Sequence, residues 1–453
     1  MNENSSIPPI RVLTGNQALA LGALRAGVKV VTGYPGTPSS GALASLLKMD
    51  LGDDRHVEWS VNEKVAFEIA AGAAWAGQRA LCAMKMSGLN VAADAVYSIA
   101  YSGINGGLVI YVADDSGVSA GMCEQDSRLY AGMFDLPVLE PASVAETYKL
   151  TQVAFDLSER TGSPVFVRLV TAIANAHAQV EVEEPLPPEK RDVILERDIT
   201  KYTKAGSVIC INQHRDLIAR LKQAGQIIRQ MGLNELHLSD EEGGLGIVAS
   251  GVAPAYLDEG FEILERDQVL RQPHRLHVSE GVSASPEAVV STLRVAAPHP
   301  FPAEEVRTLL KHCDTILVLE ELEPHLEKSV YIEAHKIGFE GRIIGKLDGT
   351  FSRSGEYGVE QVVRGIGEAL GVKETRFLPL RLRRFAKENL VSNTAEQLAA
   401  ARPITVCAGC PHRGTYMAVN QALKKLKFKK DDVMVTGDIG CTILGMNPPF
   451  HTV

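Results

Sequence analysis

The feature that most constrains the fold is an alternation of short apolar runs, glycine-containing turns and longer helical stretches through the first 180 residues. The predicted strands are VKVVTGY (28–34), LCAMKM (81–86), GLVIYVADD (107–115) and PVFVRLVT (164–171). The predicted helices cover 16–27, the alanine-rich stretch 62–80, and 144–162. Strands that alternate with helices predict an α/β fold, a parallel sheet with helices on both faces. Such sheets bind ligands at the carboxyl ends of their strands.

The middle of the chain predicts a linker followed by a second α/β unit. The stretch VEVEEPLPPEKRD (180–192) is charged and proline-rich, and a helical pattern follows at 215–232. Residues 181–244 are therefore predicted as a linker with a surface helix. Strand, glycine turn and helix return at 245–264, so 245–372 is predicted as a second α/β unit. Within it, 266–293 reads as an inserted hairpin or loop.

A third unit is predicted from residue 395 to 453. It would contain the strands ITVCAGC (404–410) and DDVMVTGDIGC (431–441) with a helix between them. Two strands in about 55 residues can hardly close an α/β core. We therefore expect 395–453 to be an incomplete unit.

Composition excludes several classes of protein. A net charge of −9 without a dense basic block argues against nucleic acid or an anionic membrane as partner. The one basic run, KKLKFKK (424–430), is typical of a solvated helix end. No apolar stretch reaches the roughly 18–20 residues that span a bilayer, and the N-terminus lacks a secretory signal pattern. Seven scattered cysteines suit a reducing cytoplasm.

The segment CAGCPHRG holds two cysteines, Cys407 and Cys410, in C-x-x-C spacing. A structural zinc site needs four ligands, and Cys441 is the nearest further thiol, 31 residues on. A redox dithiol beside a strand and helix also fits this spacing. A third possibility is a turn at a helix start that presents backbone N–H groups to a phosphate. Spacing alone leaves these three open.

Three other segments carry weaker signals. GYPGTPSS (33–40) is a strand-to-helix turn that can equally be a proline-led, Ser/Thr-capped helix start. Glu63 opens a predicted helix, where a carboxylate also simply complements the helix dipole. GDIGC (437–441) resembles turns that lie beside phosphates. No nucleophile elbow, Walker loop or H-E-x-x-H helix is present.

Together and in this order, these segments resemble a known family. The matching stretches include GYPGTPSS, EWSVNEKVAFEIAAGAAWAGQRA, EQDSR, CAGCPHRG and GDIGC, and they run almost from end to end. The chain resembles the large (alpha) subunits of indolepyruvate ferredoxin oxidoreductases, within the thiamine diphosphate-dependent 2-oxoacid:ferredoxin oxidoreductases. The resemblance implies a pyrimidine-binding domain (1–180), a transketolase-C-like domain (245–372) and a pyrophosphate-binding domain (395–453).

The resemblance also assigns roles to residues. It implies that Glu63 hydrogen-bonds the aminopyrimidine ring of thiamine diphosphate, and that Thr37 lies beside the reacting centre. The implied cofactor-binding residues are Gly36, Pro38, Cys407, Gly409, Cys410, His412, Arg413, Gly437, Asp438, Gly440 and Cys441. The C-x-x-C loop then belongs to the cofactor pocket, and no residue of this chain is expected to bind a metal.

The implied reaction is the oxidative decarboxylation of an aryl 2-oxoacid such as indolepyruvate. Coenzyme A is the acyl acceptor, and the products are an acyl-CoA, CO2 and reduced ferredoxin. The cofactor is thiamine diphosphate with Mg2+, and we expect the [4Fe–4S] clusters on partner chains. The expected partners are a chain that completes the pyrophosphate domain, a small beta- or gamma-type subunit and ferredoxin, in a cytoplasmic hetero-oligomer.

The sequence departs from the family pattern at three points. The motif that holds Mg2+ and the cysteine-rich ferredoxin-like domain do not occur in these 453 residues. A split gene, a truncated sequence or a recoded stop codon would each explain this. The family's T-R-I-S-H-like motif reads TAIANAH, with Ala172 for the arginine and Asn175 for the histidine. The alternative hypothesis is therefore a catalytically silent assembly subunit that retains the fold.

Overall fold

The structure is a computed structural model. It describes residues 9–120, 123–189, 191–193, 197–266, 270–272, 275–277, 287–371, 387, 390–391, 393–395, 397–400, 406–437 and 441–451. The chain forms two compact units, Met1–Phe377 and Leu378–Val453.

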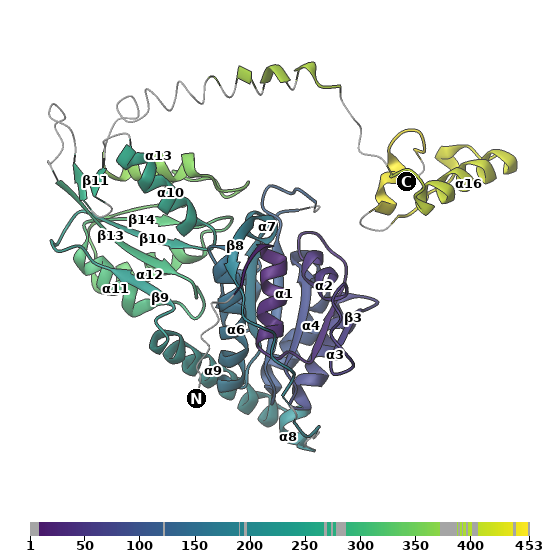
Figure 1. Ribbon diagram of the computed structural model, residues 1–453, viewed down its shortest axis with the longest axis horizontal. Helices are drawn as coiled ribbons and strands as arrows, with labels where there is room; N and C mark the ends of the chain where they lie inside the picture. The colour runs from purple at the N-terminus through teal and green to yellow at the C-terminus, as the bar shows by residue number, and fades with distance from the viewer. Residues whose placement is uncertain are drawn as a thin grey trace. The chain divides into compact units, whose positions relative to one another are not determined.

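The first unit opens with a six-stranded parallel sheet flanked by helices (Figure 1). The order of its strands is β3-β2-β4-β5-β7-β6. Its strands are β2 (Val30–Gly33), β3 (His56–Trp59), β4 (Ala80–Lys85), β5 (Leu108–Asp114), β6 (Val138–Leu139) and β7 (Val165–Val170). A separate ribbon pairs β1 (Ile10–Thr14) antiparallel with β8 (His177–Glu181). The predicted α/β fold with a parallel sheet is confirmed.

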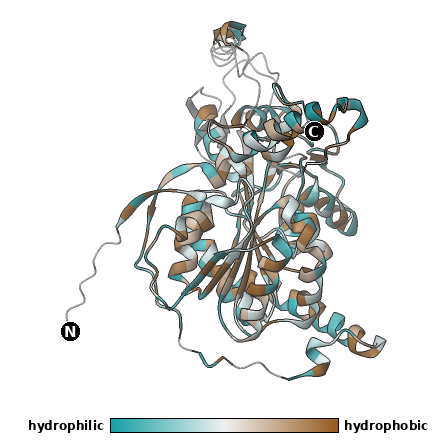
Figure 2. Ribbon diagram, turned by 90° about the vertical axis from the view of Figure 1, so that its right-hand side faces the viewer, coloured by the Kyte–Doolittle hydropathy of each residue, from teal (hydrophilic) through white to brown (hydrophobic). Residues whose placement is uncertain are grey.

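Helices cover both faces of this sheet. They are α1 (Gly15–Arg25), α2 (Ser40–Leu46), α3 (Glu63–Trp75), α4 (Met86–Ser102), α5 (Arg128–Met133), α6 (Val144–Thr161) and α7 (Thr171–Asn175). Along β4, Cys82 and Met84 pack into one core cluster with residues of α3 and α4, whereas Leu81 and Ala83 are buried on the other face. Figure 2 shows the resulting apolar strands enclosed between helices.

Local sequence signals explain where these helices begin and end. Thr14 and the side chain of Gln17 form a reciprocal capping box at the start of α1. The Ser143 hydroxyl accepts from the Glu146 N–H at the start of α6, and Gly162, in the left-handed conformation with φ 64°, ends that helix. The predicted helix 144–162 is therefore observed to within one residue.

A second, seven-stranded sheet follows in the order β11-β12-β13-β10-β14-β15, with β9 also paired to β13. Its strands are β9 (Asn234–His237), β10 (Leu245–Ser250), β11 (Leu270–Gln272), β12 (Arg275–His277), β13 (Glu287–Val295), β14 (Thr315–Leu319) and β15 (Arg342–Ile344). β13, β10, β14 and β15 are parallel, whereas β11–β12 is an antiparallel hairpin. The helices are α10 (Ala253–Arg266), α11 (Ala303–His312), α12 (His325–Ile337) and α13 (Val359–Ala369).

Residues 181–244 contain more than the linker and surface helix that the sequence predicts. They include α8 (Ile199–Tyr202), the long α9 (Ser207–Gln230) and β9. We refer to the six-stranded sheet with its helices as the first domain of this unit, and to the seven-stranded sheet with its helices as the second. α9 begins eight residues before the predicted start and packs against α4 and α6 of the first domain, where Leu217 is buried. β9 adds an antiparallel edge to the second sheet.

The second unit has a small core of its own. It contains α16 (Pro411–Leu426) and the 3₁₀ turns η1 (Lys430–Asp432) and η2 (Cys441–Met446). Val406, Tyr416 and Phe450 form its buried cluster. The strands predicted at 404–410 and 431–441 are absent from the described residues 406–410, 431–437 and 441. A strand needs a neighbour to hydrogen-bond, and 406–437 and 441–451 supply none.

Candidate active site

The loop after β2 lies at the carboxyl edge of the first sheet. The Gly36 N–H donates to the Ser40 hydroxyl at 2.7 Å, and the Ser39 hydroxyl donates to the Gly36 carbonyl at 2.7 Å. These bonds fix the turn that carries Thr37, whose side chain is exposed, while Pro38 is buried. The predicted residues Gly36, Thr37 and Pro38 thus lie where a parallel sheet places its ligands.

Asn16, near the start of α1, ties this loop to the segment after β7. Its Nδ2 donates to the Pro38 carbonyl at 2.9 Å and to the Ala174 carbonyl at 3.0 Å. Its Oδ1 accepts from the Tyr111 hydroxyl at 2.9 Å. The Asn16 side chain is buried, so all of these bonds are shielded from water. Sequence reasoning missed Asn16, although a polar residue in the apolar-patterned stretch NQALALGAL is a signal that could have found it.

Glu63 is the first residue of α3, which Asn62 caps by accepting from the Val65 N–H. Its side chain is only 7% exposed and lies against Gly88 of α4. A Cβ on Gly88 would stand 2.5 Å from Glu63 Cγ and 2.6 Å from Oε1, so only glycine leaves room for the carboxylate. Within the described part of the chain, this carboxylate makes no hydrogen bond or ion pair.

An unpaired buried carboxylate is unfavourable unless a ligand provides its partner. A ring nitrogen that shares a proton with a carboxyl group, as an aminopyrimidine does, is such a partner. Glu63 therefore fits the pyrimidine side of thiamine diphosphate.

The TAIANAH segment forms the short helix α7 at the same edge of the sheet. The Thr171 hydroxyl donates to Asp115 Oδ1 at 3.0 Å, which anchors the start of α7 beside the end of β5. Ala172 and Asn175 replace the charged and imidazole groups that the family resemblance implied here. This part of the edge consequently carries neither a guanidinium nor an imidazole from those two positions.

The CAGCPHRG turn lies in the second unit. Gly409 has φ +75°, a conformation that favours glycine, and Cys410 caps α16 with Pro411 in the first turn. Cys410 Sγ lies 3.3 Å from His412 Nδ1, and the Cys407 carbonyl accepts from the Cys410 N–H at 3.2 Å. The turn therefore presents a helix N-terminus, the geometry that suits an anion.

The remaining predicted residues of the second unit divide into two groups. Arg413, Gly437 and Cys441 are exposed, and Cys441 begins η2. Asp438 and Gly440 lie outside the described residues. Among the residues that are described, no three His, Cys, Asp or Glu side chains are grouped as metal ligands would be. Glu63 and Thr37 belong to the first unit, where both lie at the carboxyl edge of the same sheet. The cysteine turn belongs to the second unit.

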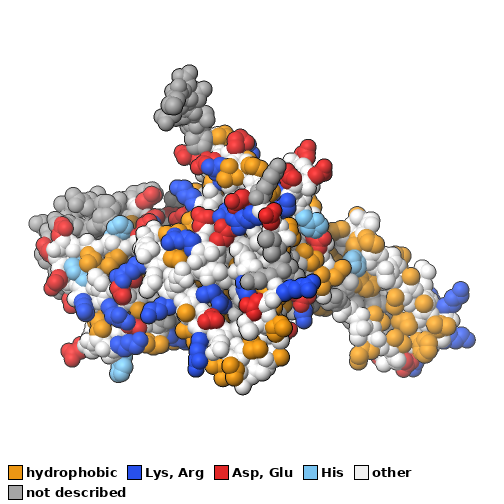
Figure 3. Space-filling model, turned by 90° about the horizontal axis from the view of Figure 1, so that it is seen from below, with side chains coloured by type: hydrophobic (Ala, Val, Ile, Leu, Met, Phe, Trp, Pro, Cys, Tyr) orange, Lys and Arg blue, Asp and Glu red, His pale blue; other side chains and the backbone are white. Residues whose placement is uncertain are grey.

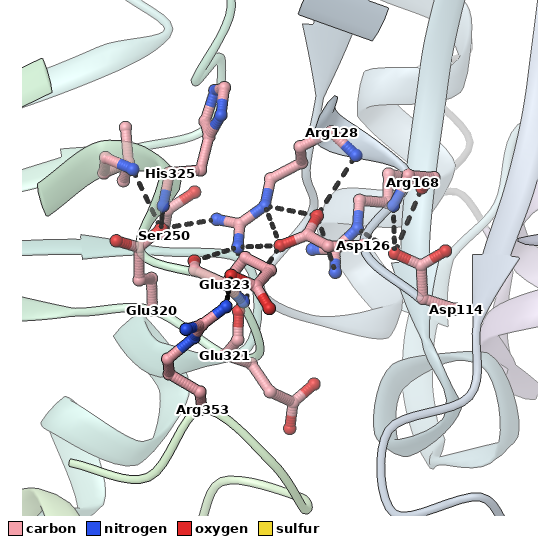
Figure 4. A network of polar contacts seen from close by, with 12 residues as sticks. Asp114, Asp126, Arg128, Arg168, Ser250, Glu320, Glu321, Glu323, His325 and Arg353 are labelled. Carbon is pink, nitrogen blue, oxygen red and sulfur yellow. Dashed lines mark hydrogen bonds and ion pairs between the residues drawn. The ribbon is translucent and has the colours of Figure 1, made fainter. Parts of the chain in front are cut away.

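A buried polar network joins the two domains of the first unit (Figure 4). Arg128 donates to Asp126 at 2.5 Å in the first domain and to Glu320 at 2.8 Å in the second. Arg168 donates to Asp114 at 2.6 Å and also to Glu140. Sequence reasoning noted EQDSR only as a family segment and missed this role.

The charges of the network have strong effects on its acids. Burial opposes ionisation of Asp126, but the neighbouring guanidinium groups of Arg128 and Arg168 hold its pKa well below its usual range. Burial raises the pKa of Glu320 despite the nearby Arg128. Arginine suits position 128 because the several N–H groups of its planar guanidinium can donate to several acceptors at once.

A cavity of about 700 Å³ opens at the opposite, amino-terminal edge of the first sheet. Gly27, Lys29 and Arg79 line it, and the Arg79 guanidinium is already paired with Glu159 at 2.8 Å. Ligand sites in open parallel sheets lie at the carboxyl edge, so this cavity is a weaker candidate than the Thr37–Glu63 edge.

Comparisons with known proteins show what the chain is similar to. Residues 21–228 match the family described as pyruvate flavodoxin/ferredoxin oxidoreductase, thiamine diphosphate-binding. Over 448 residues the chain is 33% identical to an indolepyruvate oxidoreductase subunit IorA of Archaeoglobus fulgidus, covering 97% of this chain and 65% of that subunit. An IorA subunit of Pyrococcus abyssi is 31% identical over 453 residues, 98% of this chain and 63% of that subunit. The chain thus spans less than two thirds of these relatives' length.

A solved structure has the same fold. It is a 2-oxoglutarate:ferredoxin oxidoreductase from Magnetococcus marinus, with 2-oxoglutarate, coenzyme A and succinyl-CoA bound. The TM-score is 0.62 at 16% identity, over 80% of this chain and 65% of the other. None of the helices that the structure describes here combines the length and apolarity needed to cross a bilayer.

Proposed function

We propose that this chain is a component of a thiamine diphosphate-dependent 2-oxoacid:ferredoxin oxidoreductase, because it is 33% identical to an indolepyruvate oxidoreductase subunit IorA over 97% of its length. The substrate we propose is an aryl 2-oxoacid such as indolepyruvate, with coenzyme A as acyl acceptor. The products are an acyl-CoA, CO2 and reduced ferredoxin. The observation that carries this proposal is the buried carboxylate of Glu63, which has no partner in the part of the chain that the structure describes and lies at the carboxyl edge of the matched region.

Thiamine diphosphate, when bound, supplies the nucleophilic carbon and the electron sink for decarboxylation. Glu63 holds the proton that its carboxyl group shares with the pyrimidine ring. Gly36 and Pro38 fix the turn so that Thr37 can donate its hydroxyl to the substrate. The helix N-terminus that follows Cys407, Gly409 and Cys410, with His412 and Arg413 in its first turn, suits the diphosphate. The family resemblance adds Gly437, Asp438, Gly440 and Cys441 as further cofactor-binding residues.

The proposed complex needs groups that these residues do not supply. Mg2+ would neutralise the diphosphate, and [4Fe–4S] clusters on partner chains would carry electrons to ferredoxin. The solved relative binds a 2-oxoacid and coenzyme A, which supports the same ligand classes here. Acidic and basic side chains are interspersed on the face shown in Figure 3, and the net charge is −9, which favours small substrates and protein partners over nucleic acid. Seven free cysteines support a cytoplasmic location.

A second candidate is a silent assembly subunit. Ala172 and Asn175 favour it, because neither supplies the charge that the related motif places at this edge. The two functions differ in whether the assembled complex consumes a 2-oxoacid.

The test is a reconstitution assay. The chain is co-purified with its native partner chains, supplied with thiamine diphosphate, Mg2+, coenzyme A and indolepyruvate, and followed by reduction of ferredoxin. We expect acyl-CoA formation that depends on this chain and on the cofactor. A complete complex that contains this chain but forms no acyl-CoA from any aryl 2-oxoacid would favour the silent subunit.

A further inference from the structure

We propose that Lys85 binds the carboxylate of the 2-oxoacid substrate. This inference rests on the proposed function and adds to it the residue that selects an acid. Lys85 is the last residue of β4 and the N-cap of the 17-residue helix α4. It therefore lies at the carboxyl edge of the sheet, between the strands that precede and follow it in the sheet order.

The stem of Lys85 packs directly on the Thr37 loop. A Cβ built on Gly36 would stand 2.8 Å from Lys85 Cγ and 2.9 Å from Lys85 Cδ, so the absence of a side chain at Gly36 makes room for the lysine. Gly36 precedes Thr37 in the chain. The ammonium is thus carried on a stem that is held against the same turn as the Thr37 hydroxyl.

The Lys85 ammonium has no partner within the part of the chain that the structure describes, where it makes no hydrogen bond or ion pair. Its side chain is half-buried, not fully solvated. The first turn of α4 also lacks a side-chain cap, so its N–H groups add positive potential at this point. A carboxylate satisfies both the ammonium and the helix start.

Glu63 provides an independent indication that a ligand occupies this edge. Its carboxylate is more than nine-tenths buried, unpartnered, and packed on Gly88 in the first turn of the same helix, α4. A 2-oxoacid brought beside Glu63 introduces a second negative charge into a poorly solvated site. Two like charges in a poorly solvated site repel strongly unless a cation lies between or beside them, and Lys85 supplies one where Ala172 supplies none.

The test uses the complex of this chain with its partner chains and thiamine diphosphate. Two unreactive competitors differ only in charge: 3-(indol-3-yl)propionate and its primary amide. Their inhibition constants and the KM and kcat for indolepyruvate are measured for the wild type, for Lys85→Met, for Lys85→Arg and for the exposed control Lys48→Met. Lys85→Met should weaken the acid by roughly 10- to 100-fold, the range for loss of one charge-assisted hydrogen bond, and change the amide less than threefold.

The remaining outcomes decide the matter. Lys85→Arg should recover most of the preference for the acid, and Lys48→Met should match the wild type. Equal changes for acid and amide in Lys85→Met would overturn the carboxylate site, because a general loss of structure affects both ligands. A wild-type complex that binds the acid through Lys85 but consumes no 2-oxoacid would refute the proposed function and leave the carboxylate site supported. If the acid binds no better than the amide in the wild type, the inference is wrong.

Discussion

Glu63 combines three properties at the scale of a single residue: it is buried, it opens a helix, and it has no hydrogen-bond or ion-pair partner among the described residues. The helix start makes its negative charge tolerable, because the N-terminal dipole of α3 favours an anion. The dipole does not explain why a glycine, Gly88, lies against the Glu63 side chain. A carboxylate that needs this space is better explained by a ligand that shares its proton.

The substitution Glu63→Gln should reduce turnover of the assembled complex by at least about 100-fold, a typical loss for a removed proton-transfer group, because an amide cannot share a proton as a carboxyl group does. The fold should be retained, since the two side chains have nearly the same shape. The readout is ferredoxin reduction, with thermal unfolding as the check on structure. Glu68→Gln, on the exposed side of the same helix, is the control. Near wild-type turnover in Glu63→Gln would show that this carboxylate only complements the dipole at the start of α3 and has no role in catalysis.

The cysteine turn gives a second prediction at this scale. The purified chain should contain no stoichiometric zinc or iron, because Cys407 and Cys410 have no third ligand among the described residues. The measurement is elemental analysis of protein purified without chelators. One equivalent of either metal in the wild type, absent from Cys410→Ser, would show that the turn is a metal site.

At the scale of elements, Asn16 holds together three parts of the sheet edge that are remote in sequence. Replacing it by alanine leaves the Pro38 and Ala174 carbonyls and the Tyr111 hydroxyl without partners in a buried place. Asn16→Ala should therefore lower the free energy of unfolding by about 3 kcal/mol. Tyr111→Phe, which breaks only one of these bonds, should cost about 1 kcal/mol. Urea unfolding measures the free energy of unfolding of both variants. Equal losses in the two variants would show that the Asn16 bonds to the Pro38 and Ala174 carbonyls do not contribute to stability.

The elements of the first domain were largely predictable from the sequence, and the reason is physical. β2, β4, β5 and β7 are buried on both faces, so each reads as a continuous apolar run between glycine turns. α9 was assigned too late a start because its first turn is the short apolar run VICI (208–211), which has no helical spacing of apolar and polar residues. The strands expected at 404–410 and 431–441 have apolar sequences, but a strand forms only where another strand can pair with it.

The candidate site was predictable only in part. Thr37 follows a predicted strand, so its place at the carboxyl edge follows from the α/β pattern. Glu63 follows β3, a strand that the sequence analysis did not predict. Asn16 was not predictable in its role, because its partners are 22 and 158 residues away. Lys85 was likewise overlooked, since nothing in the sequence shows that its stem packs on Gly36.

At the scale of the whole molecule, the polar junction between the two domains should make stability depend on pH. The pKa of His325 is lowered to about 4, mainly by burial and to a smaller extent by the positive charge of Arg128. An unfolded histidine takes up its proton near pH 6.5, so the unfolded state binds more protons between pH 6.5 and 4. The free energy of unfolding should therefore fall as the pH falls through this window, by roughly 2 kcal/mol at pH 5 from this residue.

The check is urea unfolding at pH 7.5 and pH 5, followed by tryptophan fluorescence. His325→Gln should lose less stability between these pH values than the wild type, whereas the exposed control His335→Gln should behave as the wild type does. The pKa of His299 is also lowered to about 4 by burial, so part of the pH dependence should persist in His325→Gln. An unchanged slope in that variant would contradict the prediction.

The predicted cofactor-binding residues fall in two separate units, which bears on cofactor affinity. Glu63 lies in one unit and the Cys407–Arg413 turn in the other, and the described residues contain no acidic cluster for Mg2+. A diphosphate needs cationic compensation, so a polypeptide of these 453 residues alone should bind thiamine diphosphate weakly or not at all. Calorimetric titration with thiamine diphosphate and Mg2+ measures this, with and without partner chains. Tight one-to-one binding by the lone chain would contradict it.

Arg128 has one further consequence, for how such chains can be recombined. Its guanidinium bonds Asp126 from its own domain and Glu320 and the Glu321 and Glu323 carbonyls from the next. A chimera in which the first domain is replaced by that of a distant relative would therefore leave buried charges without partners. Residues 320–323 would have to be exchanged together with that domain. The two domains are separate folds but a single unit of exchange, and a shuffling library should place its crossover points outside this pair.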